Sequence, residues 1–288
     1  MLQTAVLCRN EAKSIARCLA GLKQQAEALP PAFRPLIVFV LENGSDDGTA
    51  ELAQSAALPL QAVGLFEVHA IAGLPAGKAR AWNRFLALAS SPIVAFVDAD
   101  VGLSPGALAK LVATLANNPQ LDLAGAVPRL APELEIEGFW QDVFAIPYHG
   151  LRPAPSLAGG AYAARLATLS PLPEDTINED LALSLRHEGR FVLVDDAAVF
   201  VVPPKNLGQF LRQRVRILRG DVQAKARFGA GLKGHRRRSF DDVKAYFHAG
   251  GGLRLVAFAA ALCTARLYAS LSSFAASDKD WKPSAGRS

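Results

Sequence analysis

The stretch LIVFVLENGSDDGT, from Leu36 to Thr49, indicates the fold most directly. Its first six residues are apolar and rich in β-branched side chains, which is typical of a buried strand. This strand runs directly into a polar turn, and a short helix is expected after the turn. Apolar strands followed by polar residues recur at Thr4–Cys8 and at Pro92–Val97. Strands that alternate with helices predict an α/β fold with a mostly parallel sheet flanked by helices.

Three polar clusters come directly after the three expected strands. They are Arg9–Glu11, Glu42–Asp47 and Asp98–Asp100. In open α/β sheets ligands bind beyond the carboxyl ends of the strands, so the clusters predict an active site at this edge of the sheet. Asn10 and Ser104 stand where helices are expected to begin, and both residue types commonly cap helices.

Composition and charge narrow the class of protein. The chain has 288 residues, 51% of them hydrophobic, so it can bury a large core. Residues 203–288 carry 17 Lys and Arg against 5 Asp and Glu, whereas residues 1–202 carry 14 against 21. The three cysteines and five histidines are scattered, which excludes a disulfide scaffold and a Cys/His zinc site. Sparse cysteines and the absence of a signal-peptide pattern predict a cytoplasmic location.

The DAD sequence places two carboxylates directly after a buried strand. Alternate residues of an extended strand face the same way, so Asp98 and Asp100 can address one hard cation. Mg²⁺ or Mn²⁺ prefers such oxygen ligands and keeps positions open for phosphate oxygens. A solvated turn also places aspartates at strand ends, so the motif alone leaves both interpretations open.

Two further motifs have a chemical and a structural interpretation. Asn178-Glu179-Asp180 precedes an amphipathic helix, where a carboxylate can act as a general base or can simply interact with the helix dipole. Lys78 stands at the expected start of a helix, where a phosphate would be well bound. A solvated lysine on a glycine-hinged loop is the alternative.

Taken in order, seven motifs resemble those of the family 2 glycosyltransferases, which have the GT-A fold. They are VLCRNE (Val6–Glu11), ENGSDDGT (Glu42–Thr49), GKARAWN (Gly77–Asn83), DAD (Asp98–Asp100), GGAYAAR (Gly159–Arg165), NED (Asn178–Asp180) and QRVRI (Gln213–Ile217). Each motif is short, and the specificity lies in their common order. The resemblance implies a GT-A domain over residues 1–220. Residues 221–288 are expected to form a basic, partly apolar helical extension.

The resemblance implies that the donor is a nucleotide-sugar. Glu11 and Asp46, with Asp47 behind them, would hold its base and ribose, and Lys78 would approach its diphosphate. An acidic turn of this kind favours UDP in the family, while GDP and dTDP donors stay open.

The resemblance also implies the catalytic groups. Asp98 and Asp100 would hold Mg²⁺ or Mn²⁺ between the two phosphates, with Asp100 the more direct ligand. Asp180 would deprotonate the acceptor hydroxyl for direct attack on the anomeric carbon, which inverts the configuration of the sugar. Gln213 and Arg216 would close over the diphosphate and the acceptor.

One residue departs from the family pattern. The tryptophan of the family's QxxRW element is Ile217 here, so the aromatic platform for an acceptor sugar is missing. Processive members also carry several membrane-spanning helices, which this sequence lacks. We therefore expect one sugar to be added to a saccharide acceptor in each encounter.

The expected extension carries a basic cluster followed by an apolar segment, Leu253–Phe274. The cluster consists of Lys233, His235, Arg236, Arg237, Arg238 and Lys244. The longest uncharged stretch, Leu255–Ala265, has 11 residues, which is too short to cross a bilayer. Basic residues beside an amphipathic helix suit an anionic membrane surface, and the acceptor would then be a lipid-linked saccharide of bacterial envelope or exopolysaccharide assembly. A core helix after a solvated loop is the alternative, and the lack of interleaved aromatic residues argues against nucleic acid.

Two other functions stay open. A sugar nucleotidyltransferase would need a glycine-rich basic loop after the first strand, and LCRNEAKS contains no glycine. A non-catalytic nucleotide-binding module would tolerate Asp180→Asn. A transferase would lose turnover with this substitution and keep donor binding.

Overall fold

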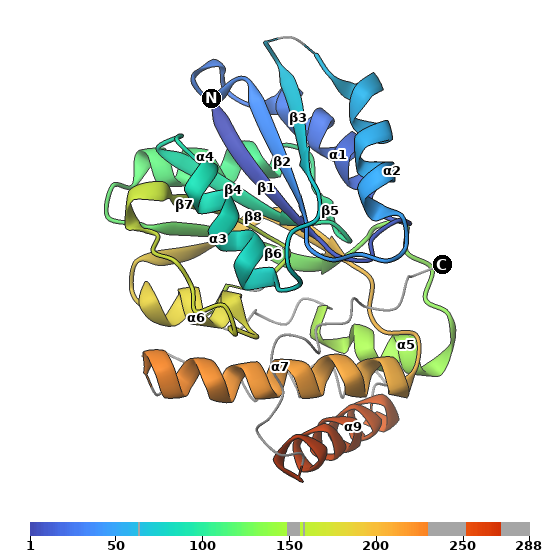
Figure 1. The fold of residues 1–288 in the computed structure, drawn as a ribbon. Helices are drawn as coiled ribbons and strands as arrows, with labels where there is room; N and C mark the ends of the chain where they lie inside the picture. The colour runs from blue at the N-terminus through green and yellow to red at the C-terminus, as the bar shows by residue number, and fades with distance from the viewer. Residues whose placement is uncertain (63, 149–155, 158, 230–251, 272–288) are drawn as a thin grey trace.

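The computed structural model describes residues 1–62, 64–148, 156–157, 159–229 and 252–271. Within these residues, eight strands form one sheet and helices cover both of its faces (Figure 1). The strands are β1 (Leu2–Cys8), β2 (Leu36–Glu42), β3 (Phe66–Ile71), β4 (Ile93–Asp98), β5 (Gly102–Leu103), β6 (Leu123–Leu130), β7 (Ala161–Arg165) and β8 (Phe191–Val201). The α-helices are α1 (Ile15–Ala28), α2 (Thr49–Ala57), α3 (Lys78–Leu88), α4 (Ala107–Asn117), α5 (Gly138–Ala145), α6 (Glu179–Arg186), α7 (Leu207–Phe228) and α9 (Gly252–Leu271).

The sheet has the strand order β3-β2-β1-β4-β7-β6-β8-β5. Strands β3, β2, β1 and β4 pair in parallel, which confirms the α/β class and the parallel half predicted from the sequence. Strand β7 is antiparallel to both β4 and β6, and β5 is antiparallel to β8, so the other half of the sheet is mixed. The direction of β7 was not predicted, because the apolar pattern of a buried strand carries no information about its direction.

Two predicted helix caps are wrong. Asn10 has a left-handed φ of 57°, and its side-chain oxygen accepts a hydrogen bond from the backbone N–H of Asp46 at 2.9 Å. The hydroxyl of Ser104 accepts from the backbone N–H of Ala198 at 3.0 Å, and α4 begins only three residues later. Both side chains therefore join two segments that are distant in the sequence, which is a contact that local helix signals do not reveal.

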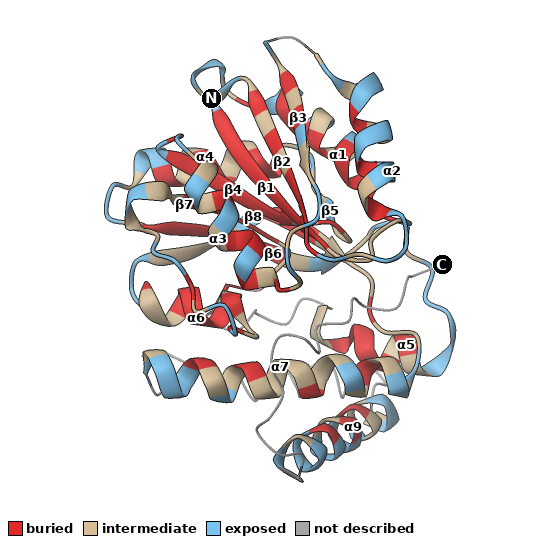
Figure 2. Cartoon of the chain, viewed as in Figure 1, coloured by how far each residue is buried: buried red, intermediate tan, exposed pale blue. Residues whose placement is uncertain are grey.

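The core lies in two layers, one on each face of the sheet (Figure 2). Helices α1, α2 and α4 cover one face, and α3 and α6 cover the other. The second layer contains a stack of three buried aromatic rings. The Phe96 ring lies 5.5 Å from that of Trp82 and 4.8 Å from that of Tyr162, centroid to centroid. These rings extend to the carboxyl edge of β4 and support the site described below.

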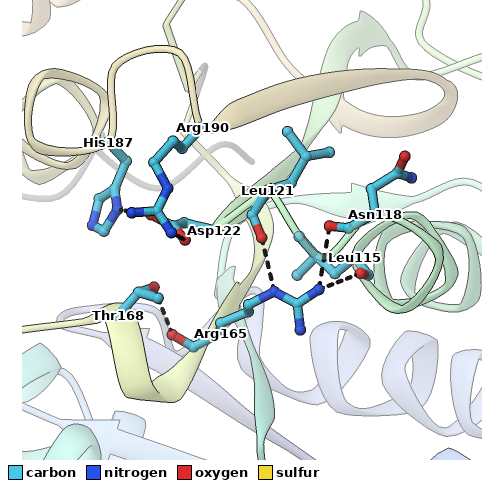
Figure 3. A network of polar contacts seen from close by, with 8 residues as sticks. All are labelled: Leu115, Asn118, Leu121, Asp122, Arg165, Thr168, His187 and Arg190. Atoms are coloured by element: carbon cyan, nitrogen blue, oxygen red, sulfur yellow. Dashed lines mark hydrogen bonds and ion pairs between the residues drawn. The ribbon is translucent and has the colours of Figure 1, made fainter.

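A polar network fixes the opposite edge of the sheet (Figure 3). The buried Asp122, directly before β6, contacts Nδ1 of His187 at 2.8 Å and accepts from Arg190 at 2.7 Å. Arg165, at the end of β7, donates to the backbone carbonyls of Leu115, Leu121 and Asn118. Because these groups join the ends of β6, β7 and β8, the network holds the mixed half of the sheet in register.

A third layer lies beyond the sheet and consists of α5, α7 and α9 (Figure 1). Its apolar contacts centre on Phe144 and Phe210, whose rings stack at 4.1 Å, and on Phe258 of α9. The boundary expected after residue 220 falls inside α7, which continues to Phe228. Helix α7 is therefore shared between the expected domain and the expected extension, and the basic cluster at residues 233–244 lies outside the described residues.

Candidate active site

The carboxyl ends of β2, β1 and β4 lie side by side. In the strand register Leu7 pairs with Asp98, and Cys8 pairs with Glu42. The three polar clusters that follow these strands therefore meet at one edge of the sheet. This is the arrangement that the strand–helix alternation predicts for a ligand site.

The loops after β1 and β2 are fastened to each other, and Asp47 supplies much of the connection. One of its oxygens accepts from the backbone N–H of Ala12 at 3.0 Å, and the other accepts from the backbone and hydroxyl of Thr49. Although partial burial acts to raise the pKa of Asp47, these hydrogen bonds lower it below its ordinary value. Asp46 is exposed and Glu11 is half-buried beside this connection. Of the three residues expected to hold base and ribose, Asp47 is thus committed to the loop itself.

The segment before α3 is held by two buried residues, the last residue of β2 and the one after it. The carboxylate of Glu42 accepts from the backbone N–H of Gly73 at 2.9 Å and from that of Ser45. Burial opposes the ionised form, yet these backbone hydrogen bonds lower the pKa of Glu42. The side chain of Asn43 donates to the carbonyl of Cys8 at 3.0 Å and accepts from Gly77 at 3.4 Å. These contacts fix the turn from which Lys78 starts α3.

Lys78 lies between carboxylates that come from two other motifs. Its ammonium group is 2.9 Å from an oxygen of Asp98, at the end of β4, and also contacts Glu179, the first residue of α6. Burial alone would lower the pKa of Lys78, but Asp98, Glu179 and Asp180 raise it well above its ordinary value. The lysine is therefore a permanent cation in a small pocket that Asp98, Glu179 and Asp180 also line.

Asp180 is the carboxylate in this pocket whose acidity is most altered. Burial first, and then the charge of Glu179, raises its pKa to about 8, while Lys78 and Arg216 act in the opposite direction. Its position is defined by a close approach to the chain, because a Cβ atom at Gly159 would lie only 2.7 Å from its Oδ2. A carboxyl group with a pKa near 8 is a much stronger base than an exposed aspartate.

The two aspartates of the DAD motif lie at the end of β4 and in the turn after it. Because β4 ends at Asp98, the strand alternation does not place the second carboxylate, that of Asp100. Both are nevertheless close to the buried Cys18, whose pKa is raised to about 12 by burial and then by their charges. No group of three or more acidic, His or Cys side chains gathers as a cation site among the described residues. Two half-buried carboxylates are oxygen ligands of the kind that Mg²⁺ or Mn²⁺ binds, and such a cation can take phosphate oxygens as its other ligands.

Arg216, on helix α7, lies near the pocket but is not one of its lining residues. Arg216 is close enough to Asp180 to lower its pKa, and Gln213 lies one turn earlier on the same face. Glu11, Asp46, Asp47, Asp100, Gln213 and Arg216 are not among the residues that line the pocket. The structure therefore brings together Lys78, Asp98 and Asp180, with the other expected residues around them.

One protein family matches the N-terminal part of the chain. The model of "Glycosyl transferase family 2" matches residues 4–135, which contain most of β1, all of β2 to β6, and four of the expected motifs, VLCRNE, ENGSDDGT, GKARAWN and DAD. Residues 4–135 of the chain thus resemble the family 2 glycosyltransferases. The match ends before three of the expected motifs, which are GGAYAAR, NED and QRVRI.

Solved structures show the same fold. A mannosyltransferase from Pyrobaculum calidifontis, in complex with GDP-Man and Mn²⁺, is 24% identical with a TM-score of 0.62, covering 94% of this chain and 76% of that one. A glucosyl-3-phosphoglycerate synthase from Mycobacterium tuberculosis, in complex with Mn²⁺, UDP-glucose and phosphoglyceric acid, is 20% identical with a TM-score of 0.53. That match covers 81% of this chain and 82% of the synthase. No curated protein sequence matches this chain.

The sequence did not point to four residues that shape the pocket or the core beside it. Glu179 is only 4% exposed and pairs with Lys78. The NED motif contains it beside Asp180, but the motif does not reveal this pairing. The hydroxyl of Tyr162 accepts from Trp82 Nε1 at 2.8 Å inside the core, and Gly159 makes room for Asp180. The GGAYAAR and GKARAWN motifs contain three of these residues. Their roles depend on contacts between motifs, which the spacing within one motif does not contain.

Proposed function

We propose that the chain is a metal-dependent, inverting glycosyltransferase that moves one sugar from a nucleotide-diphosphate sugar to a hydroxyl of a saccharide acceptor. The observation that carries the proposal is the convergence of Lys78, Asp98 and Asp180 from three separate motifs in one pocket. In this proposal Lys78 and the cation-binding Asp98 bind the diphosphate of the donor. Asp180, with its raised pKa, removes the proton from the acceptor. A nucleotide-binding module needs no such base.

Asp180 acts as the general base. It takes the proton from the acceptor hydroxyl, whose oxygen forms a bond to the anomeric carbon as the bond to the diphosphate breaks. A single displacement of this kind inverts the configuration at that carbon. Its raised pKa supports the assignment, because a base works best when its pKa lies near the working pH.

Residues on the other side of the pocket serve the donor. Asp98 and Asp100 would hold Mg²⁺ or Mn²⁺, and the bound cation would neutralise negative charge that develops on the leaving diphosphate. Lys78 and Arg216 add positive charge near the same groups, and Gln213 stands beside Arg216.

The base and ribose of the donor rest on the loops after β1 and β2. In this proposal Asp46 and Glu11 accept hydrogen bonds from them, while Asp47 holds the loop. The acidic character of this turn makes UDP the first nucleotide to test. The related structures hold GDP-Man in one case and UDP-glucose in the other, so both donors belong in the assay.

The acceptor in this proposal is a lipid-linked saccharide of polysaccharide or glycolipid biosynthesis, reached at the cytoplasmic face of a membrane. Support comes from α9. Its longest uncharged stretch alone is too short to cross a bilayer, but residues 252–270 together are long and apolar enough by length and composition. The sequence expectation about the length of this segment is therefore wrong. One face of α9 packs on α5 and α7, where Arg254 Nε lies 2.5 Å from Asp142. The other face exposes Leu253, Val256, Leu267 and Tyr268, each by more than 60%. A helix anchored on one side and apolar on the other suits a peripheral contact with lipid.

The catalytic part is tested with purified protein, Mg²⁺ or Mn²⁺, and a panel of nucleotide-sugars. Donors are first ranked by thermal shift, and sugar transfer to saccharide acceptors is then measured. Asp180→Asn should abolish turnover while the donor dissociation constant stays within threefold. Asp195→Asn, an equal change at an exposed position of β8, should leave both unchanged. Full activity of Asp180→Asn would contradict the proposal.

The membrane contact is tested separately with vesicles that contain phosphatidylglycerol. The double substitution Val256→Ser and Leu267→Ser removes two exposed apolar side chains of α9 and should lower co-sedimentation with the vesicles. Leu52→Ser, at an exposed position of α2, is the matched control. Equal co-sedimentation of all variants would exclude α9 as the contact.

A further inference from the structure

The helix that bears the base is short and has a single side chain as its cap. Helix α6 has eight residues and starts directly after Asn178. The side-chain oxygen of Asn178 accepts from the backbone N–H of Leu181 at 3.2 Å. Asp180 lies in this capped first turn, so the position of its carboxylate depends on how the first turn is held.

A second contact fixes the orientation of this cap. The side-chain nitrogen of Asn178 donates to Asp221 Oδ1, on α7, at 2.7 Å. An amide has one oxygen and one NH₂ group, and here each has a defined partner. Turning the amide over would break both hydrogen bonds, so Asp221 determines which end of Asn178 faces α6.

The backbone of α7 also approaches this cap closely. A Cβ atom at Gly220 would lie 2.6 Å from Asn178 Cβ and 3.1 Å from Ile177 Cγ2. No side chain separates the two helices at this point. The glycine therefore allows α7 to contact the residues that immediately precede Asp180.

The segment that leads to the cap is fastened by the same face of α7. Gln223 accepts from the backbone N–H of Ile177 at 2.9 Å and donates to the carbonyl of Asp175 at 2.8 Å. Arg227 binds the Asp175 carboxylate through two nitrogens, at 2.6 and 2.5 Å. Positions 220, 223 and 227 lie three and four residues apart, which places them on one side of the helix.

We propose that Asp221 is a positioning residue for the reaction, which acts through Asn178 to hold the first turn of α6 and its base Asp180 against α7. This inference rests on the proposed function of Asp180. Arg216 lies on the same helix, so the group that faces the diphosphate and the base that faces the acceptor belong to one rigid unit. Displacing a catalytic group by about 1 Å can reduce a rate about a hundredfold, so a single hydrogen bond at this junction has a large effect on turnover.

The experiment compares kcat with the donor dissociation constant in purified full-length variants. Asp221→Ala removes the acceptor for Asn178 and should lower kcat between tenfold and a hundredfold, with donor affinity within threefold of wild type. Asp221→Asn keeps an oxygen that can accept from Asn178 and should restore kcat to within threefold. Val222→Ala, at the neighbouring exposed position, should have wild-type kcat and controls for changes to this turn of α7.

A second variant addresses the case in which Asp221→Ala fails to fold. Asn178→Ser keeps an oxygen that can cap α6 but has no NH₂ group to donate to Asp221. It should lower kcat as much as Asp221→Ala does, and the two changes together should cost no more than one alone. Wild-type kcat in Asp221→Ala or in Asn178→Ser would overturn the inference and leave the proposed function standing. A wild-type enzyme that transfers no sugar would overturn both.

Discussion

Gly159→Ala should separate the position of Asp180 from the stability of the fold. Gly159 has a left-handed φ of 72°, so an alanine there would be strained by about 1–2 kcal/mol. The new Cβ would lie 2.7 Å from Asp180 Oδ2, whereas carbon and oxygen atoms ordinarily approach to about 3.3–3.6 Å. The carboxylate must therefore move by roughly 0.6–0.9 Å, and we expect kcat to fall about a hundredfold.

Gly189→Ala is the matched control for this prediction. Gly189 has nearly the same φ, 74°, and a Cβ there would meet no atom within 4 Å. Both variants should lose similar stability in urea unfolding, and only Gly159→Ala should lose turnover. Donor affinity, measured by calorimetry, should change little in either variant. If Gly159→Ala kept kcat within threefold of wild type, the reasoning that places the base against Gly159 would be refuted.

Three further predictions concern charge and burial. Because the pKa of Asp180 is about 8, kcat/KM should rise roughly tenfold per pH unit below pH 8 and level off above it; a pH–rate profile that is flat from pH 6 to 9 would contradict this. A raised pKa means that the folded protein binds this proton more tightly than the unfolded chain, so stability is lost as pH rises from about 4 to about 8. Asp180→Asn avoids that loss, and its melting temperature should exceed that of wild type increasingly over this range in thermal scans. Trp82→Phe leaves the buried Tyr162 hydroxyl without its donor and should lower the free energy of unfolding by about 1–3 kcal/mol, measured by urea denaturation.

The sequence was sufficient for the parallel half of the sheet and for the edge that carries the site. Buried strands such as Leu36–Glu42 are nearly continuous apolar runs, and each is followed by polar residues that cannot continue the strand. The antiparallel direction of β7 was not predictable in this way. It depends on which neighbours remain unpaired once β4 is in place, and that is a property of the whole sheet.

The site was predictable as a set of motifs but not as a set of contacts. Lys78, Asp98 and Asp180 were each chosen from a local pattern, and the structure brings them into one pocket. Glu179 is an acidic residue of the same motif as Asp180. Only the fold shows that it pairs with Lys78. The tie between Asp221 and Asn178 spans 43 residues, a separation at which local spacing predicts nothing.

The surroundings of the carboxylates at this edge divide them into two kinds with different chemistry. Glu42 and Asp47 are surrounded by backbone N–H donors, which lower their pKa values and keep them ionised as parts of the loops. Among the residues that the structure describes, no backbone N–H donates a hydrogen bond to the Asp180 carboxylate. Burial and the charge of Glu179 raise its pKa instead. A carboxylate already satisfied by backbone hydrogen bonds has little affinity for another proton, so it is a poor base. Residues 1–202, in which acidic residues outnumber basic ones, therefore contain several candidate bases. The distribution of hydrogen bonds among them favours Asp180 as the one that removes a proton.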